Sequence, residues 1–177
     1  MTPGRGEVRL DVARADEAPV LANLLELYIH ELSGIFGVEI QPDGRFGYDK
    51  LPLYWSEPAT RHAFVIRCGS GLAGFALVTR GSPASDDSQA FDVAEFFVLR
   101  RFRRTGVGRR AAALLWNSLP GNWVVRVAEG NVAALAFWKD AIARYTAHPS
   151  ETTRAGNPHS WRVFTFASNP DPLSLIP

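Results

Sequence analysis

The fold is decided by one stretch of the chain, Val98-Leu99-Arg100-Arg101-Phe102-Arg103-Arg104-Thr105-Gly106-Val107-Gly108-Arg109-Arg110. It follows apolar residues 91 to 99, typical of a strand inside a sheet, and it opens residues 105 to 119, which have a helical pattern. The first N–H groups of a helix lack partners within the helix and lie at its positive end. Gly106 and Gly108 let other atoms approach, and arginine is a good counter-charge for phosphate. The stretch therefore predicts an anion site, best suited to a diphosphate; the alternative is an ordinary helix start with a solvated basic face.

Upstream of this stretch, the chain predicts a strand, a helix, a long loop and a hairpin. Residues 8 to 12 alternate apolar and polar, as in a half-buried strand, and apolar residues recur at helical spacing from 20 to 32. Asp16 is the expected cap of that helix. Residues 33 to 58 are rich in glycine, proline and aromatic residues, which predicts a loop with room for one short helix. Residues 63 to 67 and 75 to 79 predict an antiparallel hairpin.

Downstream, residues 123 to 127 predict a strand and residues 131 to 143 a helix capped by Asn131. Residues 161 to 166 predict the last strand, for which residues 145 to 148 are the candidate partner. This order of elements predicts one mixed α/β domain over residues 1 to 177, with a single strand-helix-strand crossover in its second half.

Composition excludes several classes of protein. The chain has 177 residues, of which 46% are hydrophobic, enough for one substantial core. Its 19 basic residues balance 18 acidic ones, which argues against nucleic acid or a membrane surface as partner. A single cysteine, Cys68, cannot form an intramolecular disulfide, and no Cys or His spacing predicts a metal site. Without an apolar leader or a membrane-spanning run, we expect a cytoplasmic protein.

Two motifs resemble those of the GNAT acyl-CoA N-acyltransferases. Residues 103 to 108, Arg-Arg-Thr-Gly-Val-Gly, resemble the family's R-x-x-G-x-G/A motif, and residues 131 to 138, Asn-Val-Ala-Ala-Leu-Ala-Phe-Trp, resemble its N-x-x-A-x-x-F/L-Y motif. One helix and one strand fill the interval between them, as in the family. The resemblance implies a mostly antiparallel central sheet flanked by helices, in which the strand at 91 to 99 splays from its neighbour.

The resemblance also implies acetyl-CoA as co-substrate. Backbone amides of the glycine loop would hold its pyrophosphate, main-chain groups at the end of the central strand would line the pantetheine, and Asn131 would meet the pantetheine or its phosphate. Arg109 and Arg110 would reach the adenosine phosphates or remain solvated. The positions implied for the cofactor are Phe97, Val98, Leu99, Arg103, Arg104, Thr105, Gly106, Val107, Gly108, Arg109, Asn131 and Trp138.

The implied reaction is attack of an amine on a thioester, which needs a base because amines are largely protonated at pH 7. Glu95 and Asp92 are the carboxylates on the central strand, and we favour Glu95 because Asp92 lies nearer the start of the strand. Side chains alternate along a strand, so residues 92 and 95 face opposite sides of the sheet unless a bulge intervenes.

The leaving thiolate would also need an acid to protonate it. Trp138 stands where the family commonly has a tyrosine, and an indole N–H is not usefully acidic. Tyr145, Tyr28 or solvent would then take this role.

We expect the acceptor to be a small-molecule amine, approaching from the side formed by the first helix, the aromatic loop and the C-terminal hairpin. The alternative function is a non-catalytic CoA-binding module of the same fold. A nucleic-acid binder that uses Arg100 to Arg110 fits the balanced charge poorly. The oligomeric state stays open, a homodimer included.

Overall fold

The computed structural model describes residues 6 to 168. In chain order the elements are β1 (Val8–Val12), a 3₁₀ turn (Ala15–Glu17), α1 (Ala18–Phe36), α2 (Leu53–Ser56), β2 (Arg61–Cys68), β3 (Gly71–Arg80), β4 (Phe91–Val98), a second 3₁₀ turn (Arg100–Phe102), α3 (Val107–Ser118), β5 (Gly121–Ala128), α4 (Val132–Tyr145), β6 (Ser150–Arg154) and β7 (Trp161–Ser168). Within residues 6 to 168, no helix is long and apolar enough to cross a membrane.

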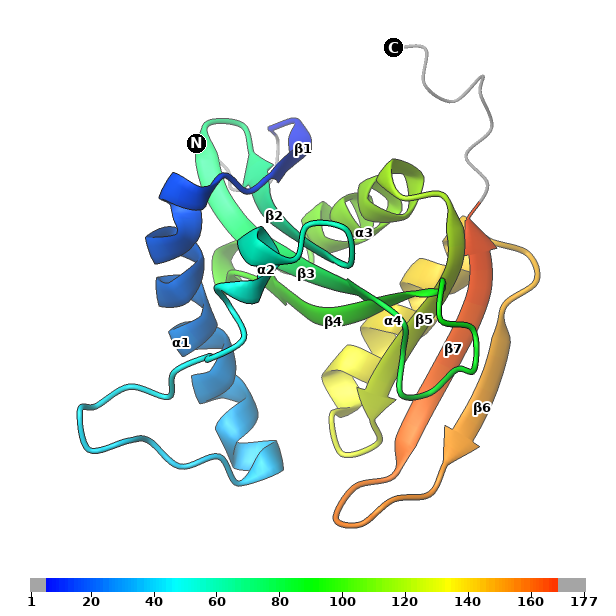
Figure 1. The fold of residues 1–177 in the computed structure, drawn as a ribbon. Coiled ribbons are helices and arrows are strands. Elements are labelled where there is room, and N and C mark those ends of the chain that lie inside the picture. Colours follow the sequence, from blue (N-terminus) through cyan, green and yellow to red (C-terminus); the bar gives the residue numbers. More distant parts are fainter. Residues whose placement is uncertain (1–5, 169–177) are drawn as a thin grey trace.

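The described strands form one seven-stranded sheet in the order β1-β2-β3-β4-β5-β7-β6 (Figure 1). All neighbouring pairs are antiparallel except β4 and β5, which are parallel and are joined through α3. The mixed α/β fold and the single crossover predicted from the sequence are confirmed.

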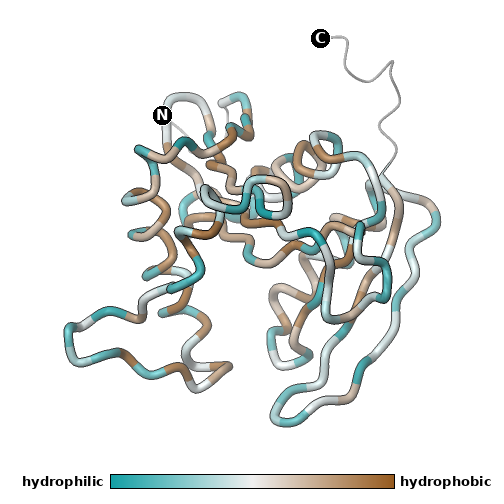
Figure 2. The backbone as a smooth tube through the Cα atoms, in the orientation of Figure 1, coloured by the Kyte–Doolittle hydropathy of each residue, from teal (hydrophilic) through white to brown (hydrophobic). Residues whose placement is uncertain are grey.

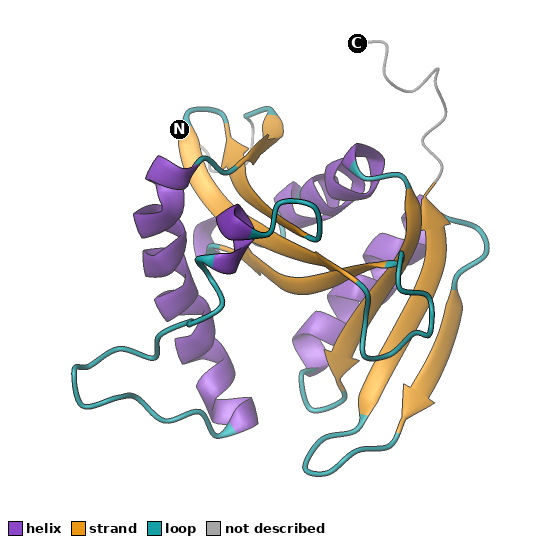
Figure 3. Cartoon of the chain, in the orientation of Figure 1, coloured by secondary structure: helices purple, strands orange, loops and turns teal. Residues whose placement is uncertain are grey.

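Helices cover both faces of the sheet, as the cartoon in Figure 3 shows. On one face, α1 and α2 pack on a core that includes Leu21, Tyr54, Phe75 and Leu77. On the other face, α3 and α4 pack on a core whose largest fully buried side chains are Trp116 and Trp123. Figure 2 shows hydrophobic residues along the central strands and hydrophilic ones along many of the loops.

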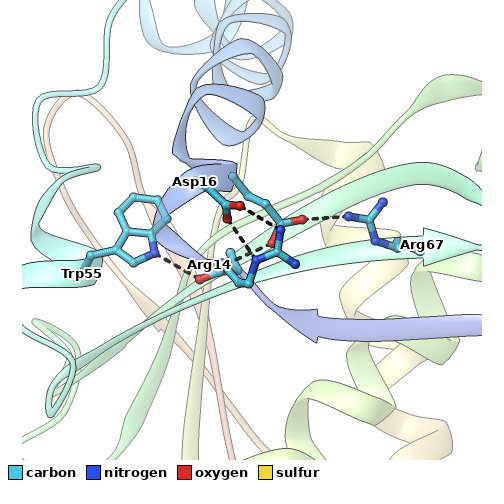
Figure 4. Close-up of polar contacts among 6 residues, drawn as sticks. Arg14, Asp16, Trp55 and Arg67 are labelled. Atoms are coloured by element: carbon cyan, nitrogen blue, oxygen red, sulfur yellow. Dashed lines mark hydrogen bonds and ion pairs between the residues drawn. The ribbon is translucent and has the colours of Figure 1, made fainter.

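The first helix begins differently from the prediction, because Asp16 is not its cap. The Asp16 carboxylate accepts hydrogen bonds from the Arg14 guanidinium instead, both at 3.0 Å. The preceding 3₁₀ turn is held by Glu17, which accepts hydrogen bonds from the Arg14 backbone N–H (3.0 Å) and from the Arg67 side chain (2.8 Å). The Trp55 indole donates to the carbonyl of Ala13 at 3.0 Å, so α2 is fixed to the same corner (Figure 4).

The C-terminal hairpin is shifted along the chain from its predicted position. Tyr145 is the last residue of α4, and the strand that pairs with β7 is Ser150–Arg154 rather than residues 145 to 148. Tyr145 packs against the core ring of Trp116, and this contact extends the helix past its predicted end at residue 143. All residues of β6 are exposed, so this edge strand has little of the alternating pattern that marks a half-buried strand.

Candidate active site

The site lies where β4 and β5 separate. The two strands pair only at Phe91 with Trp123 and at Asp92 with Val124, although β4 continues to Val98 and β5 to Ala128. Beyond that pairing the strands diverge, as the resemblance implies, and a cavity of about 340 Å³ opens between them. It is lined by Tyr28, Leu32 and Phe36 of α1, residues 93 to 96 of β4, residues 125 to 128 of β5, Asn131, Ala134 and Trp138 at α4, and Trp161 of β7.

A β-bulge brings the two candidate carboxylates to the same face of the sheet. Glu95 lies opposite Leu77 of β3, but Val93 lies opposite the next residue, Val78, so Ala94 is the extra residue. Leu77 belongs to the core under α1. Asp92, opposite Thr79, faces the same side because Leu77 and Thr79 are two residues apart on one strand. The simple alternation that would separate residues 92 and 95 does not hold.

Glu95 lines the cavity and its carboxyl group lies among tyrosines. The Tyr48 hydroxyl, from the aromatic loop, donates to Glu95 Oε1 at 3.1 Å. Burial raises the pKa of Glu95, and hydrogen bonds from Tyr28 and Tyr48 act in the opposite direction. A carboxylate whose pKa is raised toward neutrality is better matched to accept a proton from an amine.

Asp92 is on the same face but is not free to act. Its side chain is fully buried and accepts two hydrogen bonds from Arg126 of β5, at 2.8 and 2.9 Å. The Ser82 hydroxyl also donates to it. With both carboxylate oxygens occupied, Asp92 anchors Arg126 across the opening between β4 and β5.

The two candidates for the proton donor have different surroundings. Tyr145 is packed against Trp116, with ring centroids 4.7 Å apart, and its hydroxyl donates to Asn117 Oδ1 at 2.7 Å. It does not line the cavity, so the structure does not bring it together with Glu95. Tyr28 lines the cavity and approaches the Glu95 carboxyl. Trp138 also lines it, nearly buried, with its ring 5.0 Å from that of Phe96.

The loop before α3 is held by its own side chains. Arg103 donates to the carbonyl of Val98 at 2.7 Å and to Glu31 of α1 at 2.8 Å, and the Thr105 hydroxyl donates to the carbonyl of Phe102 at 2.6 Å. Gly106, the residue before α3, has a φ of 86° and provides no side-chain cap. The first backbone N–H groups of α3 therefore remain available to an anion.

The two glycines of this loop have different roles. Gly106 has the left-handed backbone conformation that side chains disfavour. At Gly108, a Cβ would lie 3.1 Å from the Phe137 ring of α4 and 3.5 Å from the Val98 side chain. Gly108 thus allows α3 and α4 to approach closely, beside the Phe137 ring that stacks on Phe96 with centroids 5.9 Å apart.

The other predicted cofactor positions lie on β4 and near the starts of α3 and α4. Phe97 packs in the core under α1, Val98 lies beside Gly108, and the Leu99 N–H donates to the carbonyl of Ala73 at 2.8 Å. Asn131 accepts a hydrogen bond from the Ala134 N–H at 3.2 Å, which confirms it as the cap of α4, and it lines the cavity as well. The exposed Arg109 lies 4.0 Å from Asp140, while Arg104 is exposed with a φ of 61°.

Sequence reasoning missed Arg126. It gave no individual role to Phe36, Tyr48 and Trp161, although they lie in the aromatic loop and the C-terminal hairpin expected on the acceptor side. Arg126 could have been found, because it is the charged residue within the apolar run 123 to 128. A charge that interrupts a buried strand usually has a partner or a function. The other three come from segments whose position depends on the tertiary fold.

No family model and no curated protein matches the chain. Solved structures do match in fold. An acetyltransferase from Thermus thermophilus superposes with a TM-score of 0.64 and 16% identity, covering 90% of this chain and 96% of that one. A ribosomal-protein-alanine N-acetyltransferase from Brucella melitensis gives 0.63 and 13%, covering 90% and 99%. A ribosomal L7/L12 alpha-N-protein acetyltransferase in complex with coenzyme A gives 0.61 and 12%, covering 94% and 97%. The chain therefore has the fold of the GNAT acetyltransferases.

Proposed function

We propose that this protein is an N-acetyltransferase that moves an acetyl group from acetyl-CoA to the primary amine of a small molecule. The observation that carries the proposal is the position of Glu95. A bulge directs this half-buried carboxyl group into the opening between β4 and β5, on the face covered by α1. The similarity of the fold to acetyltransferases, one of them in complex with coenzyme A, supports acetyl transfer.

The residues present fit acetyl-CoA. Gly106 adopts a conformation that exposes the first N–H groups of α3, which suit a pyrophosphate. A row of residues joins this helix start to the cavity: residues 96 to 98 of β4, Phe137 and Asn131. A pantetheine would lie along this row, against the unpaired edge of β4. Bound acetyl-CoA would supply an electrophilic thioester carbonyl and a thiol leaving group.

The chain's own groups supply the proton chemistry. Glu95, its pKa raised by burial, accepts the proton of the incoming ammonium directly or through water. Tyr48 holds the carboxyl group in place through its hydroxyl. Burial also raises the pKa of Tyr28, which makes its hydroxyl group a weaker acid than a free phenol. Tyr28 therefore stays protonated as a hydrogen-bond donor in the cavity, and solvent returns the proton to the thiolate.

The test is amine-dependent turnover. The protein is incubated with acetyl-CoA and a panel of primary amines, while thiol release is followed by a colorimetric reagent and acetylated products by mass spectrometry. We expect release that depends on both protein and amine, with one acetyl group added to the amine nitrogen.

One outcome would contradict the catalytic function. Binding of acetyl-CoA by calorimetry without any acetylated amine would identify the chain as a non-catalytic CoA-binding module. The presence of Trp138 in place of the family's usual tyrosine is the feature that favours this alternative.

A further inference from the structure

Arg126 faces the acceptor side of the cavity. In the parallel register Val124 pairs with Asp92, and Arg126 lies two residues further along β5, on the same face as Asp92 and Glu95. Its side chain is 26% exposed and lines the cavity that Glu95 also lines. The cavity therefore contains a fixed cation as well as the candidate base.

In the part of the chain that the structure describes, one edge of the Arg126 guanidinium carries hydrogen bonds. Nε and one N–H of Nη2 donate to the two oxygens of Asp92, at 2.8 and 2.9 Å. Within residues 6 to 168, no hydrogen bond involves Nη1. The edge formed by Nη1 and the second N–H of Nη2 is left for a ligand, and this edge can bind a carboxylate through two parallel hydrogen bonds.

The guanidinium is held rigidly and sits beside aromatic groups. Asp92 is fully buried, and the ring of Trp161 lies 5.9 Å from the Arg126 Cζ. Phe36 stacks on Trp161 with centroids 6.0 Å apart, and Tyr28 forms part of the same wall. An apolar wall lowers the local dielectric and strengthens a charge-assisted hydrogen bond made there.

We propose that the acceptor is a free amino acid with an apolar or aromatic side chain. Its carboxylate binds the free edge of Arg126 while its amine lies at Glu95. The inference rests on the proposed function and adds the class of substrate. Because Asp92 already neutralises Arg126, a zwitterion leaves the net charge of the site unchanged, whereas a phosphorylated amine would add uncompensated negative charge beside Glu95.

The first test uses the unmodified protein and matched acceptors. Values of kcat/KM are measured for L-phenylalanine, its amide and 2-phenylethylamine, and for L-leucine against 3-methylbutylamine. We expect each amino acid to exceed its decarboxylated partner, and phenylalanine to exceed its amide, by about tenfold or more. Equal or higher values for the amines or the amide would overturn the inference and leave the acetyltransferase function standing. Failure of every amine would contradict the function itself.

The second test links the preference to Arg126. Arg126→Lys keeps a cation beside Asp92 but removes the planar second edge, so the ratio of kcat/KM for L-phenylalanine over 2-phenylethylamine should fall at least about tenfold. Arg144→Lys, on the exposed end of α4 in a pair with Asp140, is the matched control and should leave the ratio unchanged. An unchanged ratio in a folded Arg126→Lys protein would contradict the role of Arg126 in binding the carboxylate. If that variant does not fold, the comparison of acceptors on the unmodified protein decides whether a carboxylate is preferred.

Discussion

At the scale of single residues, two carboxylates on one strand have different surroundings because their partners differ. Asp92 is fully buried and bound by Arg126 and Ser82. Glu95 is half-buried and lies near tyrosine hydroxyls, which are neutral donors. A guanidinium compensates a buried negative charge far better than a phenol does. Asp92 therefore serves to position Arg126, while Glu95 keeps a carboxyl group that can exchange a proton.

The raised pKa of Glu95 makes a prediction about stability. A carboxyl group whose folded pKa exceeds its unfolded one contributes stability below the unfolded pKa and loses it as pH rises through the folded pKa. Glu95→Gln removes this loss, so the stability of the variant relative to the unmodified protein should be greater at pH 8 than at pH 4. Urea unfolding at the two pH values measures it, with Glu39→Gln in the exposed loop as control. A difference that is constant with pH would show that Glu95 ionises without penalty.

At the scale of elements, the site depends on how α3 starts and how closely it approaches α4. Gly108 is the point of contact, since a Cβ there would meet Phe137, which is confined by Phe96 and Trp138. The sequence motif places glycine at this position, and the structure supplies a packing reason in addition to the approach of a ligand.

This contact can be tested with a pair of glycine substitutions. Gly108→Ala should lower the free energy of unfolding by about 1–2 kcal/mol, because the Phe137 ring must shift in a packed region. Gly34→Ala, within α1 and with no atom near its Cβ, should instead raise it by roughly 0.5–1 kcal/mol through helix propensity. Thermal and urea denaturation measure both. A stabilised Gly108→Ala protein would mean that the helices yield easily at this point.

At the scale of the whole molecule, the sequence predicted the parts of the fold that local patterns determine. The apolar central strands, the two helices α3 and α4 and the Asn131 cap follow from periodicity and capping chemistry, and the structure confirms them. The polar edge strand β6 was misplaced because it buries no side chain.

The site was predictable only in part, because its geometry depends on long-range contacts. Glu95 was identified as a carboxylate on the central strand, but its face of the sheet depends on the bulge at Ala94, which no local residue pattern marks. Tyr48 reaches Glu95 across 47 residues of sequence, and Arg126 reaches Asp92 across 34. Such pairs become visible only when the sheet is assembled.

The central claim, that Glu95 is the base of an acetyl transfer, is tested most directly by the pH dependence of kcat/KM for Glu95→Gln beside the unmodified protein, with Glu39→Gln as control. We predict a loss of about 10²–10⁴-fold near neutral pH that shrinks as pH rises, because more of the amine then arrives already neutral. The control should follow the unmodified protein throughout. A folded Glu95→Gln protein with an undiminished rate, or with a loss that is the same at every pH, would contradict the assignment of Glu95 as the base.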